Sequence, residues 1–327
     1  MQTFIVTGGA GLIGANIVAG LNRRGIHNIL VVDDLNHPDK VANLNRLQFQ
    51  DYLDKDDFRA AVRAGRIAPP TTLFHLGACS ATTETRQDYL DDNNTACTRE
   101  LCEWSLAHGT RFVYASSAAT YGEGERGYDD ADTVTTALQP LNLYGWSKQK
   151  FDVWALGQGL LNRIVGLKYF NVFGPGEDHK GEMRSVVHKA HTQILDSGRL
   201  QLFRSHRPGF GDGEQDRDFV YVEDAARVTL FFHDHPEIGG LFNCGTGKAR
   251  TWLALARAIF TAMDREPAID FIDMPPALRD KYQYHTQAET AKLRATGCPV
   301  PATPLEDAVF RYVRGWLAKP SAERRLI

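Results

Sequence analysis

The sequence lacks any apolar run that approaches the roughly 20 residues of a transmembrane helix. It also lacks the hydrophobic region of a signal peptide, because an apolar strand-like run begins almost at the N-terminus, at residues 4–6. The net charge is only −3, and the basic residues are dispersed along the 327-residue chain. We therefore expect neither a membrane nor a nucleic acid as a partner.

Cysteine is scarce, with five residues in the chain, and no pair of them has the CxxC spacing or the spacing of a zinc site. Their number is odd and several lie in apolar runs, which suits reduced thiols. We expect a cytoplasmic enzyme that binds no metal. No internal repeat or low-complexity tract is present.

Short apolar runs alternate with helical stretches in the first half of the chain. We expect helices at 11–24 and 93–108, and strands at 3–7, 29–33, 72–78, 111–116 and 163–169. Strands that are apolar throughout and separated by helices predict a parallel sheet covered on both faces. The expected fold class is α/β, a doubly wound Rossmann sheet with a smaller α/β substrate lobe.

The pattern changes after Gly174, where the chain becomes polar and rich in Gly, Pro and His. We expect long loops around one helix at 186–196, and then short strands at 219–222 and 241–244 that return to the sheet. A helix at 253–264 and the residues after it would build the smaller lobe. The expected domains are 1–172 with the returning segment 219–247 for the cofactor, and 173–327 for the substrate.

A glycine-rich turn separates the first expected strand from the first expected helix. Gly8, Gly11 and Gly14 fall as GxxGxxG, with Leu12 and Ile13 between the last two. Glycine lets the backbone approach a phosphate at a helix N-terminus, where free N–H groups and the helix dipole favour an anion. The turn therefore predicts a dinucleotide site.

An acidic residue ends the second expected strand, where a carboxylate normally holds the ribose 2′-OH of NAD. This residue is Asp33, and together with Asp34 it would repel a 2′-phosphate. Lys40 and Lys55 follow and would offset that repulsion, although Lys55 also fits a solvated helix start in the acidic run 51–57. The residues alone leave the choice between NAD and NADP open.

Two further segments are expected beside the cofactor. Leu76, Gly77, Ala78, Cys79 and Ser80 end a strand at the edge of the sheet where ligands bind, and small residues there let the backbone approach the cofactor. We interpret Cys79 as a small buried filler. Asn93 has two readings, a contact with the cofactor or, with its neighbour, a cap of the following helix.

The expected catalytic residues lie further along the chain. Ser117 follows a strand, and Tyr144 and Lys148 at i and i+4 face the same side of a helix. A cation beside a tyrosine favours the phenolate, so Tyr144 would accept a proton below its usual pKa of about 10.

The three residues resemble the serine–tyrosine–lysine group of short-chain dehydrogenases/reductases. The resemblance implies that Ser117 binds the substrate oxygen, Tyr144 transfers the proton, and Lys148 binds the cofactor ribose.

Over its whole length the chain resembles the extended branch of that superfamily, which modifies sugar nucleotides. Dehydratases of the branch carry two acids after the position of Ser117, but here Ala118 and Ala119 follow. We therefore expect epimerisation or plain oxidoreduction rather than dehydration.

Four segments resemble the ADP-L-glycero-D-manno-heptose 6-epimerases: DYLDK at 51–55, GACS at 77–80, YFNVFGPGEDHKGEM at 169–183 and YQYHTQ at 282–287. The resemblance implies transient oxidation of C6 of an ADP-heptose to a ketone, with the hydride returned to the opposite face. It also implies NADP as cofactor with NAD as the alternative, a role in making the lipopolysaccharide inner core, and a homo-oligomer, commonly a pentamer.

Such a reaction needs a proton acceptor and donor for each orientation of the ketone. The resemblance assigns one role to Tyr144 and the other to Lys180 of the HKG loop. A lysine in a glycine-flanked loop can have its pKa lowered by nearby cations, whereas the sequence context alone also fits a solvent-exposed lysine.

The resemblance further implies cofactor contact by Val172 and substrate contact by several residues. Arg217 among them suits a diphosphate, because a guanidinium binds oxygens in pairs. Leu76, Glu182 and Lys189 differ from residues found in some members, and the loop at 204–215 is longer than in the shortest members. The implied substrate contacts are Ser117, Asn171, Lys180, Glu182, Lys189, Phe203, Arg204, Ser205, His206, Arg217 and Tyr282.

Three alternatives stay open at this point. A UDP- or GDP-sugar 4-epimerase keeps the reaction class, but the HKG loop and the Tyr282 segment fit heptose enzymes. A sugar-nucleotide dehydrogenase would release reduced cofactor at each turnover. A non-catalytic sensor of sugar nucleotides would not need the intact Ser117, Tyr144 and Lys148.

Overall fold

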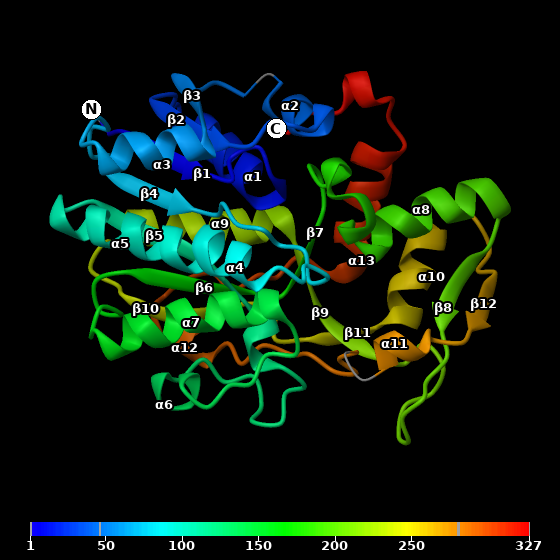
Figure 1. Ribbon diagram of the computed structural model, residues 1–327. Coiled ribbons are helices and arrows are strands. Elements are labelled where there is room, and N and C mark those ends of the chain that lie inside the picture. The colour runs from blue at the N-terminus through cyan, green and yellow to red at the C-terminus, as the bar shows by residue number, and fades with distance from the viewer. Residues whose placement is uncertain (1, 46, 280–281, 327) are drawn as a thin grey trace.

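The computed structural model describes residues 2–45, 47–279 and 282–326 (Figure 1). Its centre is a seven-stranded sheet with the order β10-β6-β5-β4-β1-β2-β3, in which every neighbouring pair is parallel. The bounds are β1 (Phe4–Thr7), β2 (Ile29–Asp33), β3 (Asp51–Asp54), β4 (Thr72–His75), β5 (Arg111–Ser117), β6 (Val165–Tyr169) and β10 (Gly240–Cys244). The expected doubly wound sheet is confirmed.

Helices cover both faces of this sheet, because successive side chains of a strand point to opposite faces. In β1, Phe4 and Val6 join the core cluster that holds Ile17 of α1 (Leu12–Arg23), whereas Ile5 joins the cluster that holds Phe151 of α7 (Leu143–Gly157). The first face also carries α9 (Val222–Asp234), and the second carries α3 (Lys55–Arg63) and α5 (Cys97–Ala107).

The strand order reverses between β1 and β4, which are neighbours in the sheet. The chain runs outward from β1 through β2 to β3, and then returns to build β4, β5 and β6 on the other side. In open α/β sheets ligands bind at such a switch point, outside the carboxyl ends of the strands. The glycine turn after β1 and the segment after β4 meet at this place.

A second group of elements stands beside the large sheet, with α8, α10, β8 and β12 together at one side of the molecule (Figure 1). It contains a three-stranded sheet, β11-β9-β7, and a two-stranded sheet, β12-β8, around a separate hydrophobic core. The bounds are β7 (Asn171–Phe173), β8 (Leu200–Phe203), β9 (Asp216–Tyr221), β11 (Ala249–Thr251), β12 (Ile269–Ile272), α8 (Val186–Ser197), α10 (Trp252–Ala262) and α13 (Leu305–Tyr312).

Short helical segments complete the chain. They are α2 (Pro38–Leu44), α4 (Gln87–Leu90), η1 (Asp91–Ala96), η2 (Ala118–Tyr121), α6 (Asp132–Thr135), η3 (Asp178–Met183), α11 (Pro276–Arg279), α12 (Ala291–Ala295), η4 (Val313–Leu317) and η5 (Ser321–Glu323). No helix in the described ranges is long and apolar enough to cross a bilayer.

Three expectations about elements are corrected. The strand expected at 219–222 belongs to β9 and joins the small three-stranded sheet, whereas the run at 241–244 does return to the large sheet as β10. The acidic run 51–57 begins as strand β3 before α3 starts. The stretch after Gly174, expected as loops around one helix, also contains β8.

Candidate cofactor and active site

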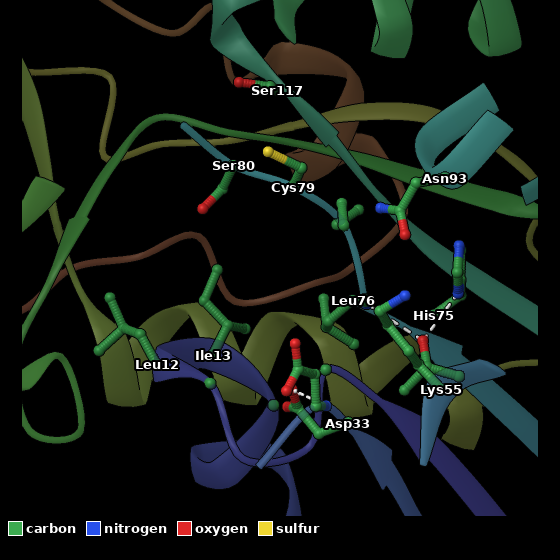
Figure 2. A pocket seen from close by; sticks show the side chains of 18 of the residues that line it. Leu12, Ile13, Asp33, Lys55, His75, Leu76, Cys79, Ser80, Asn93 and Ser117 are labelled. Atoms are coloured by element: carbon green, nitrogen blue, oxygen red, sulfur yellow. Dashed lines mark hydrogen bonds between the residues drawn. The ribbon is translucent and has the colours of Figure 1, made fainter. Parts of the chain in front are cut away.

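A cavity of about 560 Å³ opens at the carboxyl ends of the central strands. In Figure 2 Leu12 and Ile13 stand at the start of α1, and Ser117 stands on the opposite side of the view from Asp33. The cavity brings together every residue for which cofactor contact is expected: Gly8, Gly11, Leu12, Ile13, Gly14, Asp33, Asp34, Lys40, Lys55, Leu76, Gly77, Ala78, Cys79, Ser80, Asn93, Lys148 and Val172.

The glycine turn has the shape of a phosphate cradle. Gly8 has φ +65°, and a Cβ there would lie 2.7 Å from the amide nitrogen of Gly77. A Cβ on Gly14 would lie 2.1 Å from the carbonyl oxygen of Gly8. No side chain caps the N-terminus of α1, so its first-turn N–H groups face the cavity without a capping acceptor. These features fit a dinucleotide phosphate.

The carboxylate of Asp33 is held from three sides. Oδ2 accepts from the amide of Ala10 at 2.8 Å, and Oδ1 accepts from the amide of Asp34 at 2.7 Å and from Lys40 Nζ at 2.8 Å. Lys40 also donates to the carbonyl of Asp34 at 2.9 Å. Lys40 therefore neutralises Asp33, as the sequence suggested that it could.

Two other expected cofactor residues have local partners. Lys55 lines the cavity and donates to Asp56 at 2.8 Å, at the start of α3, and its contact with a cofactor stays a prediction. Asn93 lines the cavity within the π-helical segment η1 and donates to Asn94 at 3.0 Å. The capping role is wrong, because η1 runs directly into α5 and no side chain caps that helix.

The neighbour Asn94 is fully buried and holds the segment after β4 in place. Its amide group accepts from the backbone N–H of Cys79 at 2.9 Å and donates to the carbonyl of Cys79 and to Ser147 Oγ, both at 2.9 Å. Cys79 itself is half-buried and lines the cavity, so the expectation of a buried filler is wrong.

The expected catalytic trio meets at this cavity. Ser117 is the last residue of β5, and Tyr144 and Lys148 lie in the first turns of α7. Asn142 caps the N-terminus of α7, because its side chain accepts a hydrogen bond from the amide of Gly145 at 2.8 Å. Lys148 Nζ donates to the carbonyl of Ala115 at 2.8 Å.

Burial is the main cause of the pKa shifts of Tyr144 and Lys148. Burial raises the pKa of Tyr144, and the hydroxyl of Ser117 only partly opposes the shift. Burial lowers the pKa of Lys148 to about 8, although the carboxylate of Asp152 opposes the shift. The expected lowering of the tyrosine pKa by Lys148 is not found: burial raises this pKa, and the Lys148 ammonium is bound to the carbonyl of Ala115.

Lys180 lies on η3 and its half-buried side chain lines the same cavity as Ser117 and Tyr144. The pKa of Lys180 is lowered, as expected, but the cause is burial, and the carboxylate of Glu177 opposes it. The expected cause, nearby cations, is wrong. The reading as a solvent-exposed lysine is wrong as well.

Two histidines at this site are not among the expected site residues, although His179 begins the HKG loop. His75 is buried at the end of β4 between Thr7 Oγ1 at 2.7 Å and Thr98 Oγ1 at 3.0 Å, and burial lowers its pKa to about 3. His179 lines the cavity, and burial, then Lys40 and Lys180, lower its pKa to about 4. Both rings are neutral at physiological pH.

Comparisons with known proteins agree with this geometry. Residues 4–245 match the family model described as the NAD dependent epimerase/dehydratase family. A protein of Nitratidesulfovibrio vulgaris, named ADP-L-glycero-D-manno-heptose-6-epimerase, is 51% identical over 316 residues, which are 96% of this chain and 98% of that protein. A protein of Fusobacterium nucleatum with the same name is 42% identical over 325 residues, with the same coverage of 96% and 98%.

A crystal structure supports the same grouping. The ADP-L-glycero-D-manno-heptose-6-epimerase of Helicobacter pylori superposes with a TM-score of 0.82 at 26% identity, over 97% of each chain. The chain belongs to the ADP-L-glycero-D-manno-heptose 6-epimerases of this family. As a member of an NAD dependent epimerase family it works with a nicotinamide cofactor, and the cradle described above fits one.

The substrate contacts implied for a heptose epimerase lie in several places. Ser117 and Lys180 line the main cavity, whereas Asn171 is exposed on β7. Glu182 and Lys189 line a second groove of about 620 Å³, where Lys189 Nζ donates to the carbonyl of Glu182 at 3.1 Å.

Arg217, Phe203 and Tyr282 form a third group in this heptose epimerase. The guanidinium of Arg217 lies 5.1 Å from the ring centre of Tyr282, which in turn lies 6.3 Å from that of Phe203. Arg217 is buried and donates to the carbonyls of Asp216, at 2.7 Å, and Gln283.

The loop after β8 holds the other three implied residues. Arg204 Nε donates to the carbonyl of Phe271 at 3.3 Å. The amide of Ser205 donates to Asp212 at 2.8 Å, and the amide of His206 donates to the hydroxyl of Tyr284 at 3.1 Å.

Proposed function

We propose that this chain inverts C6 of the heptose in ADP-D-glycero-β-D-manno-heptose to give the L-glycero epimer. One observation carries the proposal: Ser117, Tyr144, Lys148 and Lys180 come from three separate elements and line one cavity. The names of relatives at 42–51% identity over nearly the whole chain point to the same substrate. The product serves the lipopolysaccharide inner core.

The chemistry that a bound nicotinamide would supply is reversible hydride transfer at C6. The glycines Gly8, Gly11 and Gly14 would hold its phosphates at the N-terminus of α1. Asp33 and Lys148 would hold its two riboses.

The chain's own groups manage the proton. Ser117 donates a hydrogen bond to the reacting oxygen and keeps it near the hydroxyl of Tyr144. One of Tyr144 and Lys180 takes the hydroxyl proton as the ketone forms, and the other supplies a proton when the hydride returns to the opposite face. Burial disfavours the charged form of both side chains, which suits Tyr144 to donate a proton and Lys180 to accept one.

NADP is our proposal for the cofactor, with NAD as the alternative. Lys40 already neutralises Asp33 and lies beside Asp34, so a 2′-phosphate there would meet an ammonium group rather than two unshielded carboxylates. Lys55 lines the same cavity and is held by a single exposed ion pair, which contributes little and is readily exchanged.

Substrate contacts by Asn171, Glu182, Lys189, Phe203, Arg204, Ser205, His206, Arg217 and Tyr282 are part of the proposal. Arg217 would have to exchange its backbone acceptors for diphosphate oxygens, and Tyr282 and Phe203 offer a stacking surface beside it. The domain boundaries, 1–172 with 219–247 and 173–327, stay a prediction.

We also infer a cytoplasmic location and a homo-oligomer, a pentamer by family resemblance. All five cysteines are free, which suits a reducing compartment. Light scattering of the purified protein measures the oligomer number directly.

The test uses the purified protein with each ADP-heptose epimer separately and no added cofactor. We expect both epimers to reach the same equilibrium mixture without net accumulation of reduced cofactor. In a parallel assay with excess NADP added, a rise in absorbance at the NADPH wavelength that matches the substrate consumed would instead identify a dehydrogenase. Conversion of UDP-glucose or a GDP-sugar, with ADP-heptose unchanged, would identify a 4-epimerase.

A further inference from the structure

The segment that carries Lys180 lacks the apolar anchors that normally fix a loop. None of the residues of η3 (Asp178–Met183) is fully buried, and the segment is broken at Gly181, where φ is +52°. The ammonium of Lys180 makes no hydrogen bond within the described ranges. The position of this amine therefore depends on polar contacts made by its neighbours.

Two acids just before Lys180 make those contacts. Glu177 is fully buried, and its carboxylate accepts from the amide of Ser185 at 2.7 Å and from Ser185 Oγ at 2.6 Å, at the start of α8. The carbonyl of Glu177 accepts from the amide of Lys180 at 3.0 Å. These bonds fix the backbone at the beginning of η3.

Asp178 joins three separate segments to the loop. Its Oδ1 accepts from His188 Nε2 of α8 at 3.1 Å, and its Oδ2 accepts from Trp316 Nε1 of η4 at 2.9 Å. The guanidinium of Arg324, in the C-terminal segment, donates to the same carboxylate. Burial raises the pKa of Asp178, but the bonds from His188, Trp316 and Arg324 outweigh it and leave the pKa below its usual value.

We propose that Asp178 is a positioning residue for Lys180, and that Arg324 acts through Asp178 to hold the amine of Lys180 in the cavity. The proposal rests on the proposed function, because it gives Lys180 a catalytic role. Neither Asp178 nor Arg324 lines the cavity. A change at Arg324 therefore alters where the loop lies without removing a cofactor or substrate contact.

Charge makes Arg324 the decisive partner. Trp316 offers a neutral donor, whereas a guanidinium offers charge-assisted bonds, which are about twice as strong. Without Arg324 the half-buried carboxylate of Asp178 loses a partner whose positive charge is permanent. We expect water to enter around the start of η3 in that case. Displacement of a catalytic group by about 1 Å can cost about 100-fold in rate.

The experiment measures Lys180 in the full-length protein without substrate. Competitive acetylation at a series of pH values, read by mass spectrometry of the Lys180 peptide, gives the titration midpoint of its amine. We expect a low midpoint in the unmodified protein and a rise toward about 10.4 in Arg324→Ala, because the loop becomes hydrated. Arg324→Lys should restore most of the low midpoint. Arg314→Ala, at an exposed arginine of η4, is the matched control and should change nothing.

Kinetics complete the test. In Arg324→Ala we expect kcat for inversion to fall about 10- to 100-fold, with KM and the cofactor Kd changed by less than about threefold. Asp178→Asn should behave in the same way. An unchanged Lys180 midpoint in both variants would overturn the proposal. A loss of kcat accompanied by a comparable loss of cofactor affinity and by a lower Tm would also overturn it, since this combination indicates a purely structural role.

The two hypotheses fail in different ways. If Lys180→Ala keeps normal turnover, the proposed function of Lys180 fails, whatever the acetylation midpoint does. If Lys180→Ala is inactive but Arg324→Ala leaves both the midpoint and kcat unchanged, only the positioning role fails.

Discussion

At the scale of single residues, burial tunes the two proposed proton-transfer groups in opposite directions. It raises the pKa of Tyr144 and lowers that of Lys180, and both shifts favour the neutral form of the side chain. The two groups line one cavity, and their pKa values are shifted in opposite directions. Groups whose pKa values are pushed apart by their surroundings typically mark acid and base roles.

Replacement of Lys180 by alanine should abolish inversion while the cofactor remains bound. The variant loses one of the two proton-transfer groups, and the loss of general acid–base assistance costs about 100- to 10,000-fold in rate. Epimer conversion followed by NMR measures the rate, and protein fluorescence measures cofactor binding. Near-normal turnover would remove Lys180 from the mechanism. Lys248→Ala, at an exposed lysine outside the main cavity, is the matched comparison and should keep normal turnover.

The choice of cofactor depends on Lys40 and Lys55. Changing both to alanine removes the positive charges that would meet a 2′-phosphate and leaves Asp33 unneutralised by Lys40. We expect the Kd for NADP to rise about 100-fold or more and the Kd for NAD to change much less, since two charge-assisted bonds of about 1.5–3 kcal/mol each would be lost. Isothermal titration with both cofactors measures the difference. Equal losses for the two cofactors would discard this role.

Several residues that line the main cavity could be predicted from the sequence because each has a local signal. Gly8–Gly14 lies between a strand and a helix, Asp33 ends the next strand, and Tyr144 and Lys148 share a helix face. Burial has no such signal. The sequence could not show that burial raises the pKa of Tyr144, or that burial rather than nearby cations lowers the pKa of Lys180.

At the scale of elements, a buried ion pair joins α7 to the strands beneath it. Asp152, one turn after Lys148, accepts from Lys168 of β6 at 3.0 Å and from Ser116 of β5 at 2.6 Å, and both charged side chains are 0% exposed. Lys168 also donates to Thr120 Oγ1 at 2.7 Å. Ser116 and Thr120 lie before and after Ser117 in the sequence, so these bonds hold the chain on both sides of Ser117.

Breaking this pair should be far more costly than replacing it. Asp152→Asn leaves the charge of Lys168 buried without its carboxylate, and we expect about 3–5 kcal/mol of lost unfolding free energy. The double variant Asp152→Leu with Lys168→Met removes both charges and should recover most of that loss. Urea denaturation of the three proteins measures the difference. A double variant as unstable as Asp152→Asn would contradict this account.

The parallel strands of the sheet were easier to predict than the strands outside it. Strands buried on both faces read as continuous apolar runs, as β1, β2 and β4 do. β3 is half exposed and contains two aspartates, so its sequence looked like a helix start. β8 and β12 pair with each other across a long separation in the chain, which a local pattern does not reveal.

At the scale of the whole molecule, the switch point of the sheet sets where chemistry takes place. The phosphate turn after β1, the segment after β4 and Ser117 after β5 all end at one edge, and η3 closes that edge from the second group of elements. The strand expected to return at 219–222 illustrates the limit of sequence reasoning at this scale. Its apolar pattern fits either sheet, and only the paired strands β7 and β11 decide for the smaller one.

The central claim is that one hydride leaves C6 and the same hydride returns to its other face. The most direct measurement uses ADP-heptose that carries deuterium at C6, with the purified enzyme in ordinary water and the product read by NMR and mass spectrometry. This account predicts that the L-glycero product keeps the deuterium at C6 throughout the approach to equilibrium. Replacement of the label by solvent hydrogen at the rate of inversion would contradict it, because the reaction would then proceed by loss and return of a proton.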